Sequence, residues 1–219
     1  MQKSQQVEVS VFQKAKDDNY YCGDSYFYKE VDGTFICALA DGLGSGKYAN
    51  ESSQLVVDII REYSTLPLKL IMKKCNESLF GKRGVVLGIL QIDLETQEYA
   101  YTSIGNIGLM TITADSIKKR TIPQAGYLSG YERPVKIVKD RVEDGMIFVM
   151  FSDGVTSKEI SNSYFLHKEV NHITDTFAYL YQNKLNDDTT LIAMKFVAGD
   201  LLIQFKGGFF LRMRIVLIK

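Results

Sequence analysis

The chain has 219 residues, 46% of them hydrophobic, and its 26 basic side chains balance its 26 acidic ones. This length suffices for one sizeable core, and zero net charge argues against a general binder of nucleic acid or of acidic membranes. Three widely spaced cysteines without a C-x-x-C pair fit a reducing cytosol better than a disulfide scaffold or a zinc site. The sequence shows neither a signal-peptide core nor a membrane-spanning stretch, so we expect a cytoplasmic protein.

The first part of the chain predicts three strands. Residues 7–12 alternate between two faces, which is strand periodicity. Residues 26–31 and 34–40 form two further strands, which Asp32-Gly33, a strong hairpin dipeptide, joins.

Two carboxylates stand at one end of this hairpin. Asp24 precedes its first strand and Asp41 ends its second, and because the strands run in opposite directions we expect the two side chains to lie close together. Gly42, Gly44 and Gly46 then turn the chain sharply and leave backbone carbonyls open. A carboxylate beside open carbonyls suits a hard cation, which prefers oxygen ligands. The alternative is that Asp41 only caps the following helix.

These glycines do not form a nucleotide-binding loop. A Walker A motif would need Gly where Asp41 stands and Ser or Thr where Tyr48 stands. A dinucleotide fingerprint would need a third glycine where Lys47 stands.

Two helices are expected next, the second beginning after Pro67, a favoured first-turn residue. Their predicted buried faces are Tyr48, Ser52, Val56, Ile59, Ile60 and Tyr63 in the first and Leu68, Ile71, Met72, Cys75 and Leu79 in the second. Four strands follow, at 85–92, 99–104, 107–113 and 117–122, and their short separators predict antiparallel neighbours.

The remainder begins with residues 123–134, which we expect to be a mobile surface flap. Strands at 135–138 and 146–151 should flank the turn at 143–145. A third helix is expected from Leu166, Val170, Ile173, Phe177 and Leu180, and a last strand over 191–196.

Further carboxylates follow or precede these strands. Asp153 ends the apolar strand at 146–151 and is followed by Gly154, which repeats the pattern at Asp41. Asp187 and Asp188 precede the last strand. If these acidic sites converge with Asp24 and Asp41, they would repel and take up protons unless cations neutralise them. Ligand sets with oxygen alone favour magnesium or manganese over zinc. Coincidental aspartates at strand ends are the alternative.

Taken in order, GDS at 23–25, ADGLGSG at 40–46, SDG at 152–154 and DDTT at 187–190 resemble the motifs of metal-dependent PPM-type serine/threonine protein phosphatases. Within them the chain resembles the bacterial SpoIIE branch. The resemblance covers about residues 7–196 and implies an α+β fold, a four-layer αββα sandwich of two antiparallel sheets flanked by helices. We therefore expect a phosphatase domain over residues 1–196.

The resemblance also implies two Mn²⁺ or Mg²⁺ ions bridged by a water. Carried over by position, the metal ligands would be Asp24, Asp41, the backbone carbonyl of Gly42, Asp153 and Asp187. Asp41 would bridge both ions, and the four aspartates would act in catalysis through metal-bound water. Asp188 stands where many relatives have Asn, and would hydrogen-bond to the water network of the phosphate site. Two adjacent cations make a hydroxide available near neutral pH and neutralise phosphoryl oxygens, so no Cys or His nucleophile is needed.

Two features depart from the family pattern. The Arg and His that many relatives carry near the N-terminal motifs are absent, and His167 and His172 lie in the third helix region, where we expect them to be solvated. A metal-bound water should then protonate the leaving group, with slow turnover on generic substrates. Residues 197–219 form a basic and apolar C-terminal extension, which fits an added hairpin around Gly207-Gly208, a partner-binding edge or a tail foreign to the domain. A poor helical moment disfavours attachment to a membrane surface.

The expected function is that of a monomeric phosphoserine and phosphothreonine protein phosphatase. A closer match within the SpoIIE branch, carried by CGDS, ANESS, KRG at 82–84 and GYLSG at 126–130, implies substrates among phosphorylated STAS-domain proteins of a stressosome and a role in resetting the general stress response. Two alternatives stay open. One is a pseudophosphatase that binds a partner without turnover, and the other is a metal-dependent phosphatase of a small phosphorylated metabolite.

Overall fold

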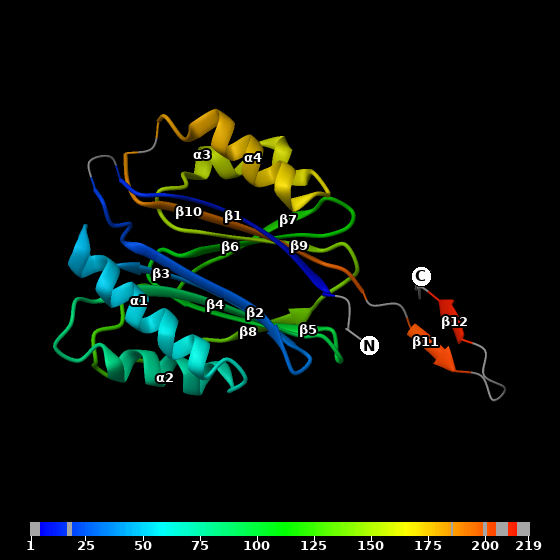
Figure 1. Cartoon of the computed structure of the whole chain (residues 1–219), viewed down its shortest axis with the longest axis horizontal. Coiled ribbons are helices and arrows are strands. Elements are labelled where there is room, and N and C mark those ends of the chain that lie inside the picture. The colour runs from blue at the N-terminus through cyan, green and yellow to red at the C-terminus, as the bar shows by residue number, and fades with distance from the viewer. Residues whose placement is uncertain (1–4, 17–18, 185, 199–200, 205–209, 214–219) are drawn as a thin grey trace.

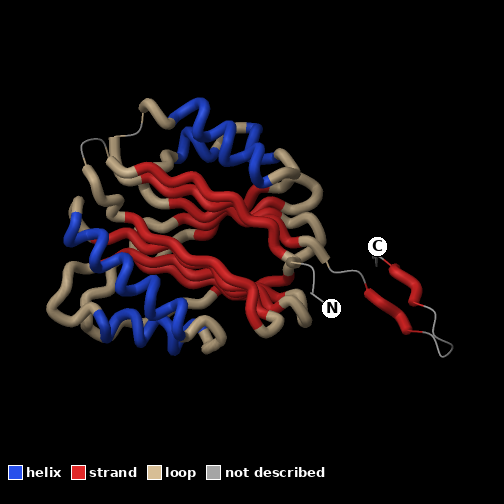
Figure 2. The backbone as a smooth tube through the Cα atoms, viewed as in Figure 1, coloured by secondary structure: helices blue, strands red, loops and turns tan. Residues whose placement is uncertain are grey.

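The computed structural model describes residues 5–16, 19–184 and 186–198, and the backbone of residues 201–204 and 210–213. Two five-stranded antiparallel sheets pack face to face, and helices cover both outer surfaces (Figures 1 and 2). The predicted αββα sandwich is therefore confirmed.

The first sheet has the strand order β2-β3-β4-β5-β8. Its strands are β2 (Asp24–Val31), β3 (Thr34–Gly42), β4 (Val85–Asp93), β5 (Glu98–Ile104) and β8 (Val138–Arg141). Asp32 and Gly33 adopt positive φ angles of 49° and 74° and form the predicted tight turn between β2 and β3. Helices α1 (Lys47–Glu62) and α2 (Leu68–Ser78) cover the outer face, so β3 and β4 are apolar along almost their whole length.

The second sheet has the order β1-β10-β9-β6-β7, so the first strand of the chain pairs with the last strand of the sandwich. Its strands are β1 (Val7–Lys14), β10 (Thr189–Phe196), β9 (Ile147–Phe151), β6 (Gly108–Ile112) and β7 (Lys118–Thr121). Helix α3 (Ser157–Ile160), the 3₁₀ helix η1 (Ser163–Leu166) and α4 (Val170–Tyr181) lie outside it. Between the sheets, the rings of Tyr99 and Phe148 pack edge to face with centroids 5.0 Å apart.

The structure corrects two predicted strand pairings. Strands β5 and β6 are not neighbours, because the chain crosses from one sheet to the other at Gly105, whose φ is 95°. A Cβ at Gly105 would lie 2.2 Å from the Val86 side chain, so only glycine fits this crossing. Likewise β8, at Val138–Arg141 instead of 135–138, pairs with β5, whereas β9 lies in the other sheet. A short separator between two strands looks the same in sequence whether it forms a hairpin turn or carries the chain from one sheet to the other.

The helix faces are partly as predicted. All five residues of the α2 face, Leu68, Ile71, Met72, Cys75 and Leu79, are buried. In α1 the face is rotated, because Tyr48 is 65% exposed and the small residues Ala49 and Ser53 pack against the sheet. Ser53 shares a 2.8 Å hydrogen bond with Ser25 of β2, which holds this face in place. The third predicted helix begins only at Val170, in α4.

Residues 123–134 form neither a helix nor a continuous strand, but they are anchored instead of loosely attached. Leu128 is buried, and its backbone exchanges hydrogen bonds of 2.8 and 2.9 Å with Val85. The carboxamide of Asn76 in α2 accepts from the amides of Ser129 and Gly130 and donates to the carbonyl of Tyr131. These contacts argue against the expected flap, whose mobility itself stays a prediction.

In the C-terminal extension, β11 (Leu201–Gln204) and β12 (Phe210–Met213) pair with each other in an antiparallel sheet of two strands. Gly207-Gly208, where a hairpin turn was expected, lies outside the described residues. The division of the chain at residue 196 stays a prediction. Among the described residues, no helix is long and apolar enough to cross a membrane.

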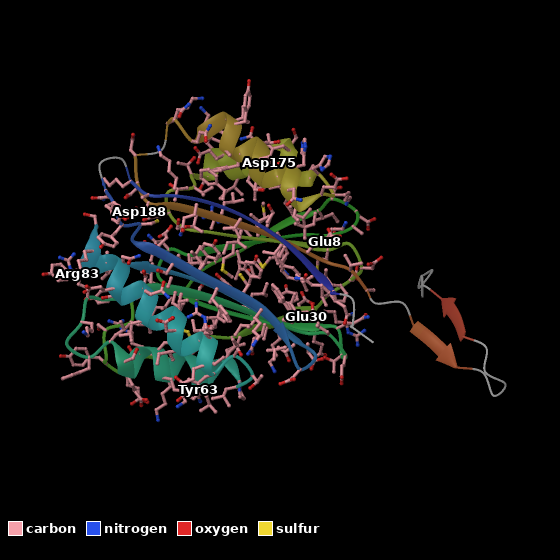
Figure 3. The ribbon with its side chains drawn as sticks, in the orientation of Figure 1. Glu8, Glu30, Tyr63, Arg83, Asp175 and Asp188 are labelled. Atoms are coloured by element: carbon pink, nitrogen blue, oxygen red, sulfur yellow. The ribbon has the colours of Figure 1, made fainter. Side chains whose placement is uncertain are left out.

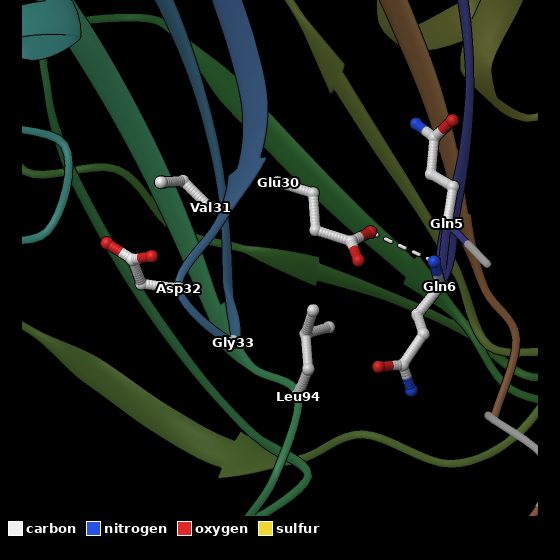
Figure 4. A pocket seen from close by; sticks show the side chains of 7 residues that line it. All are labelled: Gln5, Gln6, Glu30, Val31, Asp32, Gly33 and Leu94. Carbon is white, nitrogen blue, oxygen red and sulfur yellow. Dashed lines mark hydrogen bonds between the residues drawn. The ribbon is translucent and has the colours of Figure 1, made fainter. Parts of the chain in front are cut away.

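A cavity of about 400 Å³ opens at the β2–β3 turn (Figure 4). It is lined by Gln5, Gln6, Glu30, Val31, Asp32, Gly33 and Leu94. The backbone amide of Gln6 donates a 2.9 Å hydrogen bond to the Glu30 carboxylate across it. Seven residue steps along β2 separate this turn from Asp24, which is about 23 Å. The cavity is therefore remote from the predicted acidic site.

Candidate metal centre

Carboxylates from both sheets meet at one end of the sandwich. Asp24 begins β2 and pairs in register with Asp41 on β3, as the hairpin predicts. Asp153 follows β9 and Asp188 precedes β10, and these two strands are antiparallel neighbours, so their aspartates lie at a common end. Figure 3 shows Asp188 at this end and Glu30 at the other.

Asp24 is a buried carboxylate, and only one of its two oxygens has a hydrogen-bond partner. Its side chain is only 2% exposed, and Oδ2 accepts a 2.7 Å hydrogen bond from the Thr190 hydroxyl. Oδ1 is buried and has no hydrogen-bond partner. Burial raises the pKa of Asp24 from 3.8 to about 7, against the opposing effect of Ser152 and Thr190. A buried oxygen without a donor is costly unless a cation faces it.

Asp41 is the carboxylate whose pKa the neighbouring aspartates raise. Burial, followed in decreasing order by the negative charges of Asp24, Asp153, Asp188 and Asp187, raises its pKa from 3.8 to about 8. All the predicted acidic sites thus repel the charged form of Asp41. Coincidental placement of strand-end aspartates would not produce this convergence.

Asp153 lies at the rim of the site. Its pKa is raised by partial burial and by the charge of Asp187. The Asn106 carboxamide donates a 2.7 Å hydrogen bond to Asp153 Oδ2. Asn106 lies in the crossing between β5 and β6 and was not predicted as a site residue, because asparagine after glycine is common in any turn. Thr190, which holds Asp24, was likewise missed.

Asp187 and Asp188 differ in their surroundings. Asp187 is exposed, and its Oδ1 lies 3.6 Å from the Lys16 ammonium. Asp188 is buried, and its Oδ1 accepts a 2.9 Å hydrogen bond from the Lys16 amide. A Cβ at Gly23 would lie 2.8 Å from Asp188 Oδ2, so Asp188 packs directly against the backbone beside Asp24. The choice of Asp187 as the metal ligand stays a prediction.

Gly42 brings the first turn of α1 against the end of β3. A Cβ at this position would lie 2.0 Å from the carbonyl oxygen of Ala49, so only glycine permits the contact. The Gly42 amide donates to the Gly23 carbonyl at 3.2 Å, which ties two of the predicted motifs together. The N-cap of α1 is Gly46, which rules out Asp41 as the cap of that helix.

The residues present fit a hard divalent cation. Their side chains offer oxygen only, Asp24 Oδ1 is buried without a hydrogen-bond partner, and a cation would neutralise the negative charges that gather around Asp41. Within the described parts of the chain, no three His, Cys, Asp or Glu side chains already enclose a single point. Magnesium sites need no such cage, because the ion keeps several waters and takes one or two carboxylates.

Cysteine and histidine do not contribute to this centre. Burial, followed by the charges of Asp24 and Asp188, raises the pKa of the Cys22 thiol, so it stays protonated. His167 and His172 are exposed on the outer helical layer, with ring centroids 3.9 Å apart, as their predicted solvation requires.

A family model described as stage II sporulation protein E (SpoIIE) matches residues 31–197. Phosphoserine phosphatase RsbX of Bacillus subtilis (strain 168) is 32% identical over 192 residues, which are 88% of this chain and 96% of RsbX. The crystal structure of RsbX in complex with magnesium aligns with a TM-score of 0.81 over 87% of this chain and 95% of that one. The catalytic domain of the serine/threonine protein phosphatase PstP, solved with two manganese ions, shares the fold at 17% identity, with a TM-score of 0.72 over 87% of this chain and 98% of that one. This chain belongs to the SpoIIE family.

Proposed function

We propose that this protein is a metal-dependent protein phosphatase that hydrolyses phosphoserine and phosphothreonine. The observation that carries the proposal is the buried Asp24, whose unpartnered oxygen stands beside Asp41 where carboxylates of both sheets converge. The identity with RsbX, a phosphoserine phosphatase, supports the reaction class.

Two Mn²⁺ or Mg²⁺ ions would be held by Asp24, Asp41, the Gly42 carbonyl, Asp153 and Asp187. The magnesium in RsbX and the two manganese ions in PstP support this choice of metal. When bound, the ions supply an activated water as nucleophile and neutralise the phosphoryl oxygens.

The chain's own residues orient this centre. The Thr190 hydroxyl holds Asp24 Oδ2 and leaves Oδ1 without a hydrogen-bond partner, so Oδ1 is available to a cation. The Asn106 carboxamide fixes Asp153, and the Lys16 amide fixes Asp188. Each of these carboxylates stands within two residues of the end of a strand, so the sheets set its position.

Both histidines of the chain lie in the outer helical layer, so the leaving alkoxide takes its proton from water. We expect slow turnover on generic substrates for this reason. A His172→Ala variant should keep its phosphatase activity within about twofold, and a steep loss with the fold intact would contradict this assignment.

We further propose that the substrates are phosphorylated STAS-domain proteins in the cytoplasm, and that their dephosphorylation resets a general stress response. The support is the closer sequence resemblance within the SpoIIE family.

The deciding experiment measures phosphate release from a phosphoserine STAS protein and from p-nitrophenyl phosphate. Each is assayed with manganese, with EDTA, with Asp41→Asn and with the matched control Asp175→Asn, an exposed aspartate on α4. We expect hydrolysis that EDTA and Asp41→Asn abolish and Asp175→Asn leaves unchanged. Hydrolysis of p-nitrophenyl phosphate alone would keep the chemistry and refute the STAS substrate. Metal binding without any hydrolysis would identify a pseudophosphatase.

A further inference from the structure

A patch of aromatic and basic side chains lies beside the metal centre. It consists of Tyr48 at the start of α1, Arg83 before β4, and Tyr127 and Arg133 in the anchored segment 123–134. We call these four residues the aromatic–basic surface. All four are exposed, with Tyr48 65% and Tyr127 41% accessible to solvent.

Arg83 is held at the glycine loop that follows Asp41. Its Nη1 donates a 3.3 Å hydrogen bond to the Leu43 carbonyl, and its guanidinium lies 5.5 Å from the centroid of the Tyr48 ring. A Cβ at Gly44 would lie 2.2 Å from Arg83 Nη1, so the missing side chain provides the space that the guanidinium occupies.

Tyr127 continues this surface across the strand ends. A Cβ at Gly84 would lie 2.5 Å from the Tyr127 ring and 2.8 Å from a methyl group of Leu43, so both side chains pack over Gly84. The Arg133 guanidinium lies 5.6 Å from the centroid of the Tyr127 ring. The two cation–aromatic pairs therefore form one continuous surface.

This surface adjoins the acidic site. Asp41 pairs in register with Val86, and the Leu43 amide bonds to the Gly84 carbonyl at 2.8 Å. Arg83 precedes Val86, the strand partner of Asp41, by three residues, which is about 10 Å along the strand direction. Its side chain contacts the carbonyl of Leu43, which follows Asp41 by two residues. Figure 3 shows Arg83 and Asp188 at the same end of the molecule.

The two arginines of the surface differ in their partners from the lysines nearby. Lys16 and Lys47, at the same end, form ion pairs with Asp187 and Glu51. Arg83 and Arg133 form none with any described carboxylate, and each instead lies over an exposed tyrosine ring. Such a surface is complementary to carboxylates and to apolar groups that pack on the rings.

We propose that the aromatic–basic surface binds the residues that flank the phosphoserine of a protein substrate, and that it favours acidic flanks. The inference rests on the proposed phosphatase function and adds a sequence preference to it. The metal centre would take the phosphoryl group, while Arg83 and Arg133 bind side chains beside it.

The test compares two phosphoserine peptides of equal length, one with Asp and Glu flanks and one with Asn and Gln flanks. The manganese-loaded full chain should hydrolyse the acidic peptide with a kcat/KM about fivefold higher, because exposed ion pairs are individually weak. The double variant Arg83→Gln/Arg133→Gln should lose this preference and keep its activity on p-nitrophenyl phosphate within about twofold. The preference should also shrink at high salt.

Arg141→Gln is the matched control, since Arg141 is an exposed arginine on β8 that pairs with Glu98 at the opposite end of β5. It should leave the preference unchanged. Equal kcat/KM of the wild type on both peptides would overturn the inference and leave the phosphatase function standing. Loss of p-nitrophenyl phosphate hydrolysis in the double variant would also overturn it, because the arginines would then act at the reaction centre or in folding. Failure of the wild type on all three substrates would refute the phosphatase function and the inference with it.

Discussion

Replacing Asp41 by Asn should make the metal-free protein more stable while it abolishes metal binding. Burial and four neighbouring carboxylates raise the pKa of Asp41 from 3.8 to about 8. The folded protein therefore holds a proton that the unfolded chain releases between these two values. The folding stability that depends on protonated Asp41 is fully present below about pH 4 and is lost as the pH rises through about 8. The Asn carboxamide does not titrate, so the variant should not lose this stability.

The pKa shift of Asp41 sets an upper limit on the stability that Asp41→Asn can gain. One pKa unit corresponds to about 1.4 kcal/mol, so a rise from 3.8 to about 8 allows about 5 kcal/mol at pH 8. Asp41 is only partly buried, and water entering the rim will reduce this cost. We expect Asp41→Asn to gain about 1–2 kcal/mol at pH 8, which is about 5 °C in Tm for a chain of this size.

Thermal unfolding in EDTA between pH 5 and pH 8 measures this gain. The wild-type Tm should fall across the range, and the Asp41→Asn curve should be flatter and higher at pH 8. Added manganese should stabilise the wild type and leave the variant unchanged. Asp175→Asn should follow the wild type throughout. A variant less stable than the wild type at pH 8 in EDTA would refute the role assigned to carboxylate repulsion.

Three further substitutions test other contacts of the site. Gly42→Ala places a methyl group against the first turn of α1 and should cost about 1–3 kcal/mol in urea unfolding; an unchanged midpoint would show that the helix yields freely. Thr190→Val removes the donor to Asp24 and should weaken manganese binding about tenfold by calorimetry, whereas equal affinity would mean that this hydrogen bond orients nothing. Asn76→Ala removes three hydrogen bonds to residues 129–131 and should speed limited proteolysis within 123–134, and an unaltered cleavage rate would restore the flap interpretation.

The local part of the site could be predicted from the sequence. Asp24 and Asp41 flank one short hairpin, and the Asp32-Gly33 turn alone sets the register that pairs them. The convergence of Asp153 and Asp187 on this pair is a long-range property. No periodicity encodes which strands of two sheets become neighbours, and only the order of the four motifs pointed to it.

The side chains that orient the carboxylates could not be predicted in the same way. Asn106 lies in a two-residue separator that resembles a hairpin turn in sequence. It reaches Asp153 because the chain crosses from one sheet to the other at this point. The exposure of Tyr48 was missed because an aromatic residue at helical spacing resembles a core position. Here Ala49 takes that position, and its backbone carbonyl packs against Gly42 at the end of β3.

The pairing of β1 with β10 has a consequence for how the protein matures. Val7 lies opposite Phe196, so the first strand pairs with a strand at the far end of the sandwich sequence. Contacts with such sequence separation close late and slow the folding of a domain. Asp188 and Thr190 reach Asp24 only when β10 docks between β1 and β9. A nascent chain therefore has no competent centre until its last sandwich strand has been synthesised, and dephosphorylation begins only with the completed fold.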